Sequence, residues 1–218
     1  MFYQPDFNRP MTPSERNGAI FFLLLFFGAF TAEVIVDYHP AKLTGLFIAG
    51  WWIPLLALHE AGHALAAWLV RWQVLRISIG HGPLVRRFHI GSAEVDLRLI
   101  PVSGYVMSAP TRLRWPQLEN SLIYAAGPGI ELVLLGAIAA IVGPEQLLHR
   151  TEAIWLLAVQ ALAVAILFDA FTNLVPMTVS SKDGPVANDG LGIFRSFLLS
   201  TEAYAKQIGF RPTPEADA

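Results

Sequence analysis

The sequence predicts an α-helical integral membrane protein with about four transmembrane helices and a small β-sheet inserted between the second and the third. Of its 218 residues, 54% are hydrophobic and 15% are charged, whereas about a quarter of the residues in an ordinary soluble domain are charged. The apolar residues are clustered in four long runs, each near or above the roughly 20 residues that cross a bilayer core. Between the second and third runs, apolar and polar residues alternate instead.

The four apolar runs predict helices at residues 18–36, 43–70, 121–143 and 153–175. The first run could instead be a secretory signal, because two basic residues precede it. It is longer than the apolar core of a signal, however, and the residues that follow do not resemble a cleavage site. We interpret it as a retained helix. The predicted organisation is a cytoplasmic segment (1–17), a membrane-embedded domain (18–200) and a polar tail (201–218).

Basic residues are unevenly distributed between the predicted loops. Two Lys or Arg precede the first run, seven lie between the second and third runs, and four follow the fourth run. The two remaining loops contain one each. Because cytoplasmic loops are enriched in Lys and Arg, we expect a multi-pass protein of the plasma (inner) membrane with both termini in the cytoplasm.

Two features of the composition limit the possible partners and chemistry. The chain contains no cysteine, which excludes disulfides, thiolate metal sites and a cysteine nucleophile. The net charge of −2 identifies no partner. We expect contact with the lipid bilayer and no binding of nucleic acid, and the sequence does not determine the oligomeric state.

The region of about residues 73–106 has the two-residue period of half-buried strands. Apolar and polar residues alternate over residues 75–79 and again over residues 94–99, which predicts a small sheet with Glu94 on its solvent-exposed face. Two interpretations of this sheet remain open. It either caps the helical bundle or lies near the functional site and offers an edge to an extended peptide.

The second run contains the segment HEAGH, in which two histidines lie four residues apart. On a helix, His59 and His63 project from one face and can bind one metal ion, while Glu60 is rotated from His59 by about 100°. Zinc bound by two histidines and a carboxylate keeps a fourth position for water. Glu60 can then take a proton from that water and pass it to a leaving amine. The segment therefore predicts metal-assisted hydrolysis of an amide.

A chance coincidence or helix packing could also explain these three residues. In a membrane span this alternative is weakened, because an ionisable group at the helix centre costs roughly 2.5 kcal/mol or more and usually marks function. A third protein ligand is still required, and it must be acidic or a histidine. The candidates are Glu94, Glu131, Asp169, Asp183 and Asp189. Glu131 and Asp169 lie within apolar runs, where each could bind the metal or pair with a polar group of another helix.

The order of several motifs resembles the site-2 protease family of intramembrane zinc metalloproteases. HEAGH in one membrane helix is followed by Asn173-Leu-Val-Pro176 at the end of a later one, and then by Asp-Gly. Three further segments look like the family's sheet, its Pro-x-x-Gly-Tyr-Val segment and its Gly-Pro helix: residues 80–83, 100–106 and 126–128. The resemblance covers about residues 47–197.

The resemblance implies that His59 and His63 are zinc ligands, that Glu60 is the general base, and that an aspartate after the last core helix is the third ligand. Two Asp-Gly pairs follow Pro176, after six and twelve intervening residues, so Asp183 and Asp189 compete. We predict Asp189, because it opens an amphipathic helical pattern, whereas Asp183 could form an ordinary turn. Asn188 with Asp189 could equally be a helix N-cap.

Two other residues are interpreted through the same resemblance. Asn173 would donate a hydrogen bond to the substrate or to the developing oxyanion, or it could simply bind a neighbouring backbone group. Glu131 occupies a position that is often Asn in the family, and its role is left open.

The predicted function is an intramembrane zinc metalloendopeptidase that cleaves within or next to transmembrane segments, and single-span membrane proteins are the expected substrates. A non-catalytic zinc-binding scaffold or regulator is the first alternative, although an intact Glu60 argues against it. The second is an HExxH membrane protease of another family with a Glu, such as Glu131, as third ligand.

Overall fold

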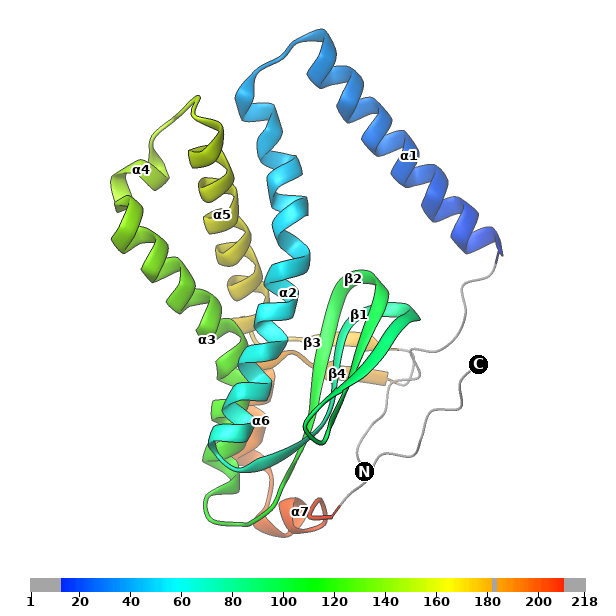
Figure 1. Ribbon diagram of the computed structural model, residues 1–218. Coiled ribbons are helices and arrows are strands. Elements are labelled where there is room, and N and C mark those ends of the chain that lie inside the picture. Colours follow the sequence, from blue (N-terminus) through cyan, green and yellow to red (C-terminus); the bar gives the residue numbers. More distant parts are fainter. Residues whose placement is uncertain (1–12, 182–183, 210–218) are drawn as a thin grey trace.

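A computed structural model describes residues 13–181 and 184–209 (Figure 1). Four long helices are present: α1 (Pro13–Val36), α2 (Thr44–Leu69), α3 (Pro116–Val142) and α5 (Ile154–Leu174). Two long strands, β1 (Trp72–Ile90) and β2 (Ala93–Pro110), connect α2 to α3. The shorter elements are η1 (Pro40–Leu43), α4 (Pro144–Leu148), β3 (Thr178–Ser181), β4 (Gly184–Ala187), α6 (Asp189–Leu198) and α7 (Thr201–Ala205).

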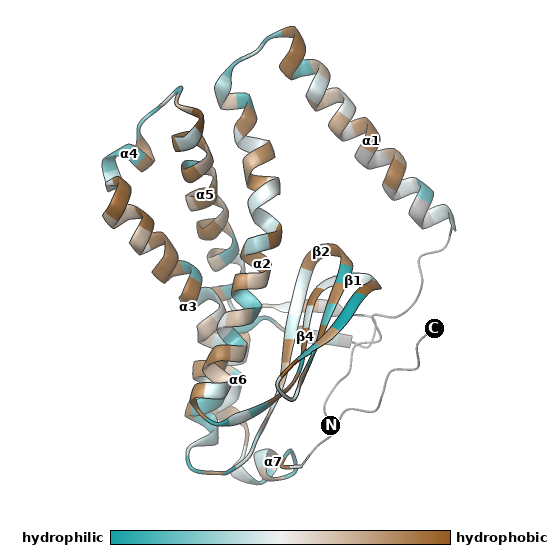
Figure 2. Ribbon diagram, viewed as in Figure 1, coloured by the Kyte–Doolittle hydropathy of each residue, from teal (hydrophilic) through white to brown (hydrophobic). Residues whose placement is uncertain are grey.

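Three helical segments of the described chain are long and apolar enough to cross a membrane: Pro40–Leu69, Pro116–Val142 and Ile154–Leu174. Figure 2 shows the hydrophobic residues along these helices. In α1, where several side chains lie outside the described part of the chain, the apolar stretch among the described residues is Phe27–Val36. The structure therefore confirms a mostly helical protein with three membrane-capable helices and a small antiparallel sheet, while the predicted count of four crossings stays a prediction.

Helices α2, α3 and α5 pack together, whereas α1 diverges from α2 beyond their connection at η1 (Figure 1). Small residues allow α2 and α3 to approach closely. An added Cβ at Gly62 would lie 2.5 Å from the carbonyl oxygen of Ala126 and 2.8 Å from the Cγ2 of Ile130. Leu55 of α2 and Ile166 of α5 belong to one cluster of buried apolar residues. This packing brings together the apolar runs that contain ionisable residues.

Strands β1 and β2 form a sheet beside α2, and each bends within its length. Residues 72–79 pair antiparallel with residues 104–110, and residues 84–90 pair with residues 93–98. Residues 76–79 also lie beside residues 94–97, so they are flanked on both sides. The segment 104–110 has β1 on one side and no second neighbour among the described strands of this sheet. Among the described strands, it therefore lies at an edge of the sheet.

The structure corrects the predicted solvent-exposed face of this sheet. Asp96 and Arg98 are buried, although their alternation with apolar residues predicted exposure. Asp96 forms ion pairs with Arg87 at 2.7 Å and with Arg98 at 3.2 Å, which compensates both charges for the loss of water. Glu94 is partly buried and pairs with Arg76 at 2.6 Å. Ion pairing, which the alternating pattern does not reveal, explains the difference.

Two boundaries also differ from the prediction. Helix α3 begins at Pro116, five residues earlier than expected, with proline in its first turn and Glu119 following, both favourable at a helix N-terminus. The segment predicted as a polar tail begins with α7, where Tyr204 is buried and its hydroxyl donates to the carbonyl oxygen of Ser196 at 2.9 Å. Residues 210–218 lie outside the described part of the chain.

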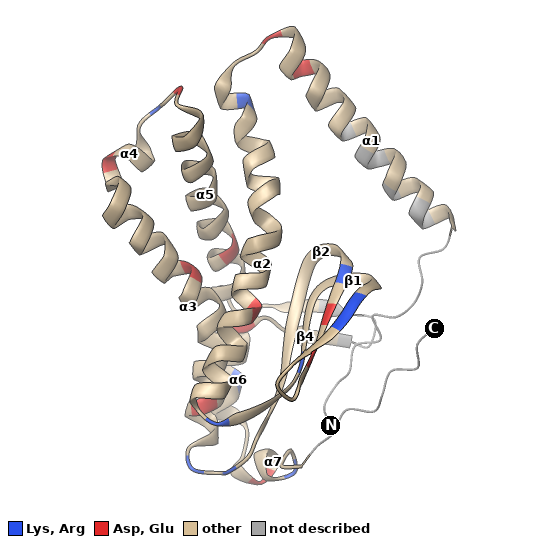
Figure 3. Cartoon of the chain, in the orientation of Figure 1, with Lys and Arg blue, Asp and Glu red and all other residues tan. Residues whose placement is uncertain are grey.

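Charged residues are distributed unevenly over the molecule. Figure 3 shows Lys and Arg in the sheet and the connections, with few along the membrane-capable helices. Acidic residues, by contrast, occur inside α2, α3 and α5. The functional site is built around these acidic residues.

Candidate metal centre

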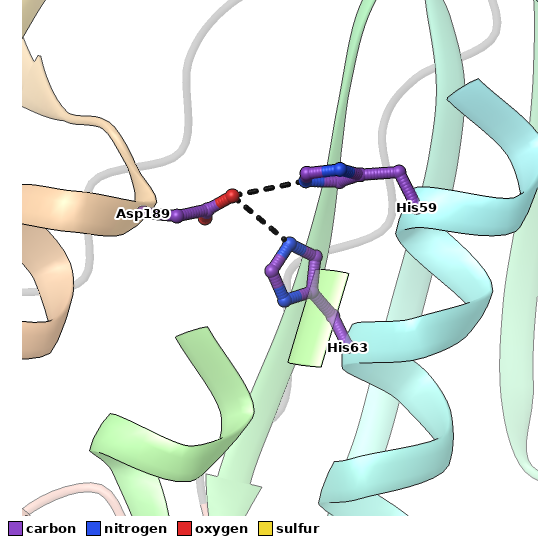
Figure 4. Close-up of side chains that lie close together, drawn as sticks. All are labelled: His59, His63 and Asp189. Atoms are coloured by element: carbon purple, nitrogen blue, oxygen red, sulfur yellow. Dashed lines mark hydrogen bonds and ion pairs between the residues drawn. The ribbon is translucent and has the colours of Figure 1, made fainter. Parts of the chain in front are cut away.

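His59 and His63 lie one turn apart on α2, and both are buried. Figure 4 shows both rings directed towards Asp189, the first residue of α6. The Asp189 Oδ2 atom lies 2.9 Å from the His59 Nε2 atom and 3.4 Å from the His63 Nε2 atom. Ligand atoms of a tetrahedral zinc site are separated by about 3.3 Å, given zinc–ligand bonds of about 2.0–2.1 Å. The three groups therefore fit a zinc ion.

The other ring nitrogen of each histidine also has a polar partner. The His63 Nδ1 atom lies 2.7 Å from the carbonyl oxygen of Ile123. A carbonyl oxygen only accepts hydrogen bonds, so Nδ1 of His63 carries a hydrogen, and the neutral ring would have its lone pair on Nε2. The His59 Nδ1 atom lies 3.3 Å from Asp169 Oδ2 and 3.4 Å from Glu131 Oε1. Partners of this kind fix the tautomer of metal-binding histidines.

Glu131 and Asp169, two candidates for the third ligand, thus face Nδ1 of His59 rather than the Nε2 atoms that converge on Asp189. Glu131 is fully buried, and neither of its carboxylate oxygens has a hydrogen-bond partner among the described residues. Its contact with His59 is an ion-pair distance rather than a well-formed hydrogen bond. His59, Glu131 and Asp169 form a second group that could hold a metal, but His63 is not part of it.

Two acidic candidates remain. Glu94 is in the sheet, paired with Arg76. Asp183 lies outside the described residues.

Asp189 has the charge state that metal binding needs. Burial by itself would raise the pKa of the Asp189 carboxyl, but its contacts with His59 and His63 outweigh burial and hold the pKa at about 2. Ligand carboxylates bind metals in their deprotonated form. At neutral pH, therefore, this side chain is ionised.

Glu60 is buried beside the edge strand of the sheet. An added Cβ at Gly104 would lie 2.5 Å from Glu60 Oε1 and 2.6 Å from the carbonyl oxygen of Ser78. Only glycine therefore fits in the Pro-x-x-Gly-Tyr-Val segment where the carboxylate approaches β2. Glu60 Oε2 has no hydrogen-bond partner among the described residues. Burying a carboxylate oxygen without a hydrogen bond costs free energy. This oxygen is therefore a candidate to accept a proton or to bind a ligand.

A second glycine makes room for the histidines. An added Cβ at Gly127 of α3 would collide with the His63 ring and would lie 2.6 Å from His59 Nε2. The glycine of the Gly-Pro pair in α3 is therefore explained by close approach to the proposed ligands, which the sequence pattern alone did not reveal.

Asn173 lies at the same site, near the end of α5. Its Nδ2 atom donates to Asp169 Oδ2 at 3.1 Å, so one of its two amide hydrogens is used within the protein. Asn173 also lines the cavity described next. Its predicted contact with the substrate or the oxyanion stays a prediction.

A cavity of about 1060 Å³ contains the site. His59, Glu60, His63 and Asp189 line it. Strand β2 contributes seven consecutive residues, 102–108, to one wall. The hairpin of β3 and β4 contributes Met177, Val179, Val186 and Ala187, and Trp52 and Phe168 are among the residues supplied by α2 and α5. The cavity thus combines a polar centre with extended backbone and apolar walls.

Comparison with known proteins identifies the class. The model of Peptidase family M50 matches residues 47–204, which is more than half of the chain. The chain belongs to Peptidase family M50, the site-2 protease family. The resemblance predicted from the motifs is thereby confirmed.

Three curated relatives show similarity over short segments. "Membrane metalloprotease ARASP, chloroplastic" of Arabidopsis thaliana is 38% identical over 52 residues, which is 24% of this chain and 12% of that protein. A "Putative zinc metalloprotease" of Chlamydia trachomatis is 46% identical over 52 residues, 24% of this chain and 8% of that protein. Another protein of that name, from Treponema pallidum, is 31% identical over 83 residues, 34% of this chain and 18% of that protein.

The matched segments cover between 8% and 18% of these three relatives. The printed names describe those proteins and agree with a membrane metalloprotease that uses zinc. They do not describe a substrate.

Proposed function

We propose that this chain is an intramembrane zinc metalloprotease that hydrolyses peptide bonds within or next to transmembrane segments of membrane proteins. In this proposal, His59, His63 and Asp189 bind the zinc and Glu60 is the general base. One observation carries it: in an apolar helix, two histidine Nε2 atoms converge on one carboxylate, Asp189. Family membership supports the same conclusion.

Each of the chain's own groups has a defined task in this mechanism. Zinc, when bound by the three ligands, supplies a Lewis acid and an open position for water. Glu60, whose Oε2 atom has no hydrogen-bond partner among the described residues, accepts a proton from the attacking water and delivers it to the leaving amine. Asn173 keeps one Nδ2 hydrogen for the substrate carbonyl as charge develops on its oxygen.

The substrate lies along the edge of the sheet in this proposal. A helical substrate must first unwind locally, because its carbonyl groups are otherwise hydrogen-bonded within the helix. The unwound segment can then lie beside residues 102–108 of β2, which line the cavity, because extended peptides are commonly held along a β-sheet. Val179 and Val186, paired in register across β3 and β4, line the same cavity and would contact apolar side chains of the substrate.

We further propose the topology that the charge pattern predicts. Helix α1 would be a fourth crossing, both termini would be cytoplasmic, and residues 18–200 would form the membrane-embedded domain of an inner-membrane protein. Single-span membrane proteins would be the substrates, and nucleic acid would not be a partner.

Metal content and cleavage, measured on the same purified preparation, test the function. The wild-type chain should contain about one zinc ion and cleave a model single-span substrate. Glu60→Gln should keep the zinc and lose cleavage. A well-folded wild-type protein that is free of metal and indifferent to added zinc and to chelators would contradict the proposal. Bound zinc without cleavage of any membrane substrate would instead favour the scaffold alternative.

A further inference from the structure

The side chain of Asn188 connects three segments of the chain next to Asp189. Its Nδ2 atom donates to the carbonyl oxygens of Thr172 at 3.0 Å and Val175 at 2.7 Å. Its Oδ1 atom accepts from the backbone N–H groups of Met177 at 3.0 Å and Leu191 at 3.1 Å. A side-chain amide offers two donor hydrogens and two acceptor positions. All four are therefore used.

The carbonyl group of Thr172 is available because of Pro176. In a continuous helix, the oxygen of Thr172 would accept from the N–H of the residue four positions later, and proline has no N–H. Helix α5 ends at Leu174, and Val175 is already extended. Asn188 supplies the missing donors. Pro176 and Asn188 are thus complementary, although the β3–β4 hairpin lies between them.

These contacts hold the start of α6 against the end of α5. The backbone N–H of Asn188 also donates to the carbonyl oxygen of Met177 at 3.1 Å, which closes the base of the β3–β4 hairpin. In the first turn of α6, an added Cβ at Gly190 would overlap the carbonyl group of Leu174. Asp189 lies between Asn188 and Gly190, so the end of α5 fixes the backbone from which its carboxylate projects.

We propose that Asn188 is a positioning residue that holds Asp189 within reach of His59 and His63 and thereby sets the affinity for the metal. This inference rests on the proposed function, in which Asp189 is a zinc ligand. It gives Asn188 a task beyond capping α6. A cap uses only the acceptor Oδ1, through its bond to the N–H of Leu191, whereas positioning uses the two donors to α5.

Two substitutions separate these roles. Asn188→Asp and Asn188→Ser keep an oxygen that caps α6, but neither keeps both donors. Asp also places a carboxylate against the carbonyl oxygens of Thr172 and Val175. Ser200→Ala is the matched control, because Ser200 caps α7 through the N–H of Ala203 at 3.3 Å and does not line the cavity.

The experiment measures zinc retention by the purified 218-residue chain during competition with a chelator, together with the absorption spectrum of the cobalt-substituted protein. Asn188→Asp and Asn188→Ser should bind zinc about 10- to 100-fold more weakly, as when other residues that support metal ligands are lost. The cobalt spectrum should change because the ligand geometry is loosened. Ser200→Ala should match the wild type in both measurements. Wild-type zinc affinity and an unchanged spectrum in both Asn188 variants would overturn the proposal.

If neither Asn188 variant folds, Pro176→Ala decides. The new N–H of residue 176 would compete with Asn188 for the carbonyl oxygen of Thr172, so zinc affinity should fall in the same direction by a smaller factor. Wild-type affinity in a folded Pro176→Ala variant would overturn the proposal.

Asp189→Ala separates this inference from the proposed function. A wild-type protein that binds no zinc contradicts the function itself. Zinc binding that survives Asp189→Ala contradicts the ligand and, with it, the positioning role. If Asp189→Ala loses zinc but the Asn188 variants bind it with wild-type affinity, only the positioning role is overturned.

Discussion

The two sides of the candidate metal centre are built in different ways. His59 and His63 come from one turn of α2, and the geometry of a single helix places their rings on one face. Asp189 comes from the segment after α5, and hydrogen bonds of Asn188 to α5 and the close contact of Gly190 place it. The helical side is a local structure, whereas the Asp189 side depends on contacts between segments. We therefore expect substitutions on the first side to remove function outright and substitutions around the second to loosen it by degrees.

The largest effect is expected from Glu60→Gln on the helical side. Loss of the general base should lower kcat by about 10³-fold or more, while zinc content and folding persist because Glu60 is not a proposed ligand. Cleavage of a single-span substrate in reconstituted vesicles, with zinc analysis of the same sample, measures both. The exposed Glu152 provides the control Glu152→Gln. Undiminished cleavage by Glu60→Gln would eliminate the proposed base.

Asp189→Ala tests the Asp189 side of the metal centre most directly. Removing a ligand should weaken zinc binding by more than about 100-fold, the upper range for loss of a supporting residue. Asp183→Ala, in the neighbouring Asp-Gly pair, is the matched comparison and should retain zinc. Metal analysis after dialysis against a chelator distinguishes them. The opposite result would make Asp183 the ligand, and loss of zinc only in Glu131→Ala would favour a protease of another family.

Gly127→Ala probes the space that α3 leaves for the histidine rings. The new Cβ would collide with His63, so we expect zinc affinity to fall by about 10-fold or more, in the range found when support of a metal ligand is lost. Gly129→Ala, two residues later on the same helix, meets no atom within 4 Å and should bind zinc as the wild type does. Equal zinc affinities of the two variants would show that the rings do not need this space.

The smallest effect is expected in the hairpin that lines the cavity. Val179→Ser combined with Val186→Ser should lower kcat/KM for substrates with apolar residues near the cleavage site by about 3- to 10-fold, because less apolar surface is buried. Zinc content should not change. Val133→Ser, an exposed position on α3 that does not line the cavity, is the control. If the double variant and the wild type had the same kcat/KM for apolar substrates and the same kcat/KM for polar substrates, the hairpin would have no part in substrate selection.

Much of the fold could be predicted from the distribution of apolar residues. The runs at 43–70 and 153–175 match α2 and α5 within one residue at each end, because length and hydropathy are local properties. The burial of Asp96 and Arg98 was not predicted, since it depends on ion pairs formed across the sheet. Similarly, Tyr204 could not be assigned to the interior, because its partners, Asn120 and Ser196, lie on α3 and α6.

The candidate site also combines features that the sequence predicts with features that only the structure shows. The spacing of HEAGH was sufficient to predict two histidines on one face with Glu60 beside them. Their positions in apolar runs made Glu131 and Asp169 candidates for binding the metal or for pairing between helices, but did not show that they would face Nδ1 of His59. Asn188 was considered only as a helix cap, because its bonds to the end of α5 become visible only when the two segments are placed in space.

The sequence by itself determined the membrane-embedded helical class, the family and the pair of histidines with its glutamate, because each depends on composition, motif order or the repeat of one helix. Only the tertiary structure decided that Asp189 lies 2.9 Å from Nε2 of His59 and that the carboxylate of Glu60 lies against Gly104. These contacts join segments far apart in the chain, and their geometry follows from the packing of α2, α3 and α5 and from the hydrogen bonds that close the chain after Pro176.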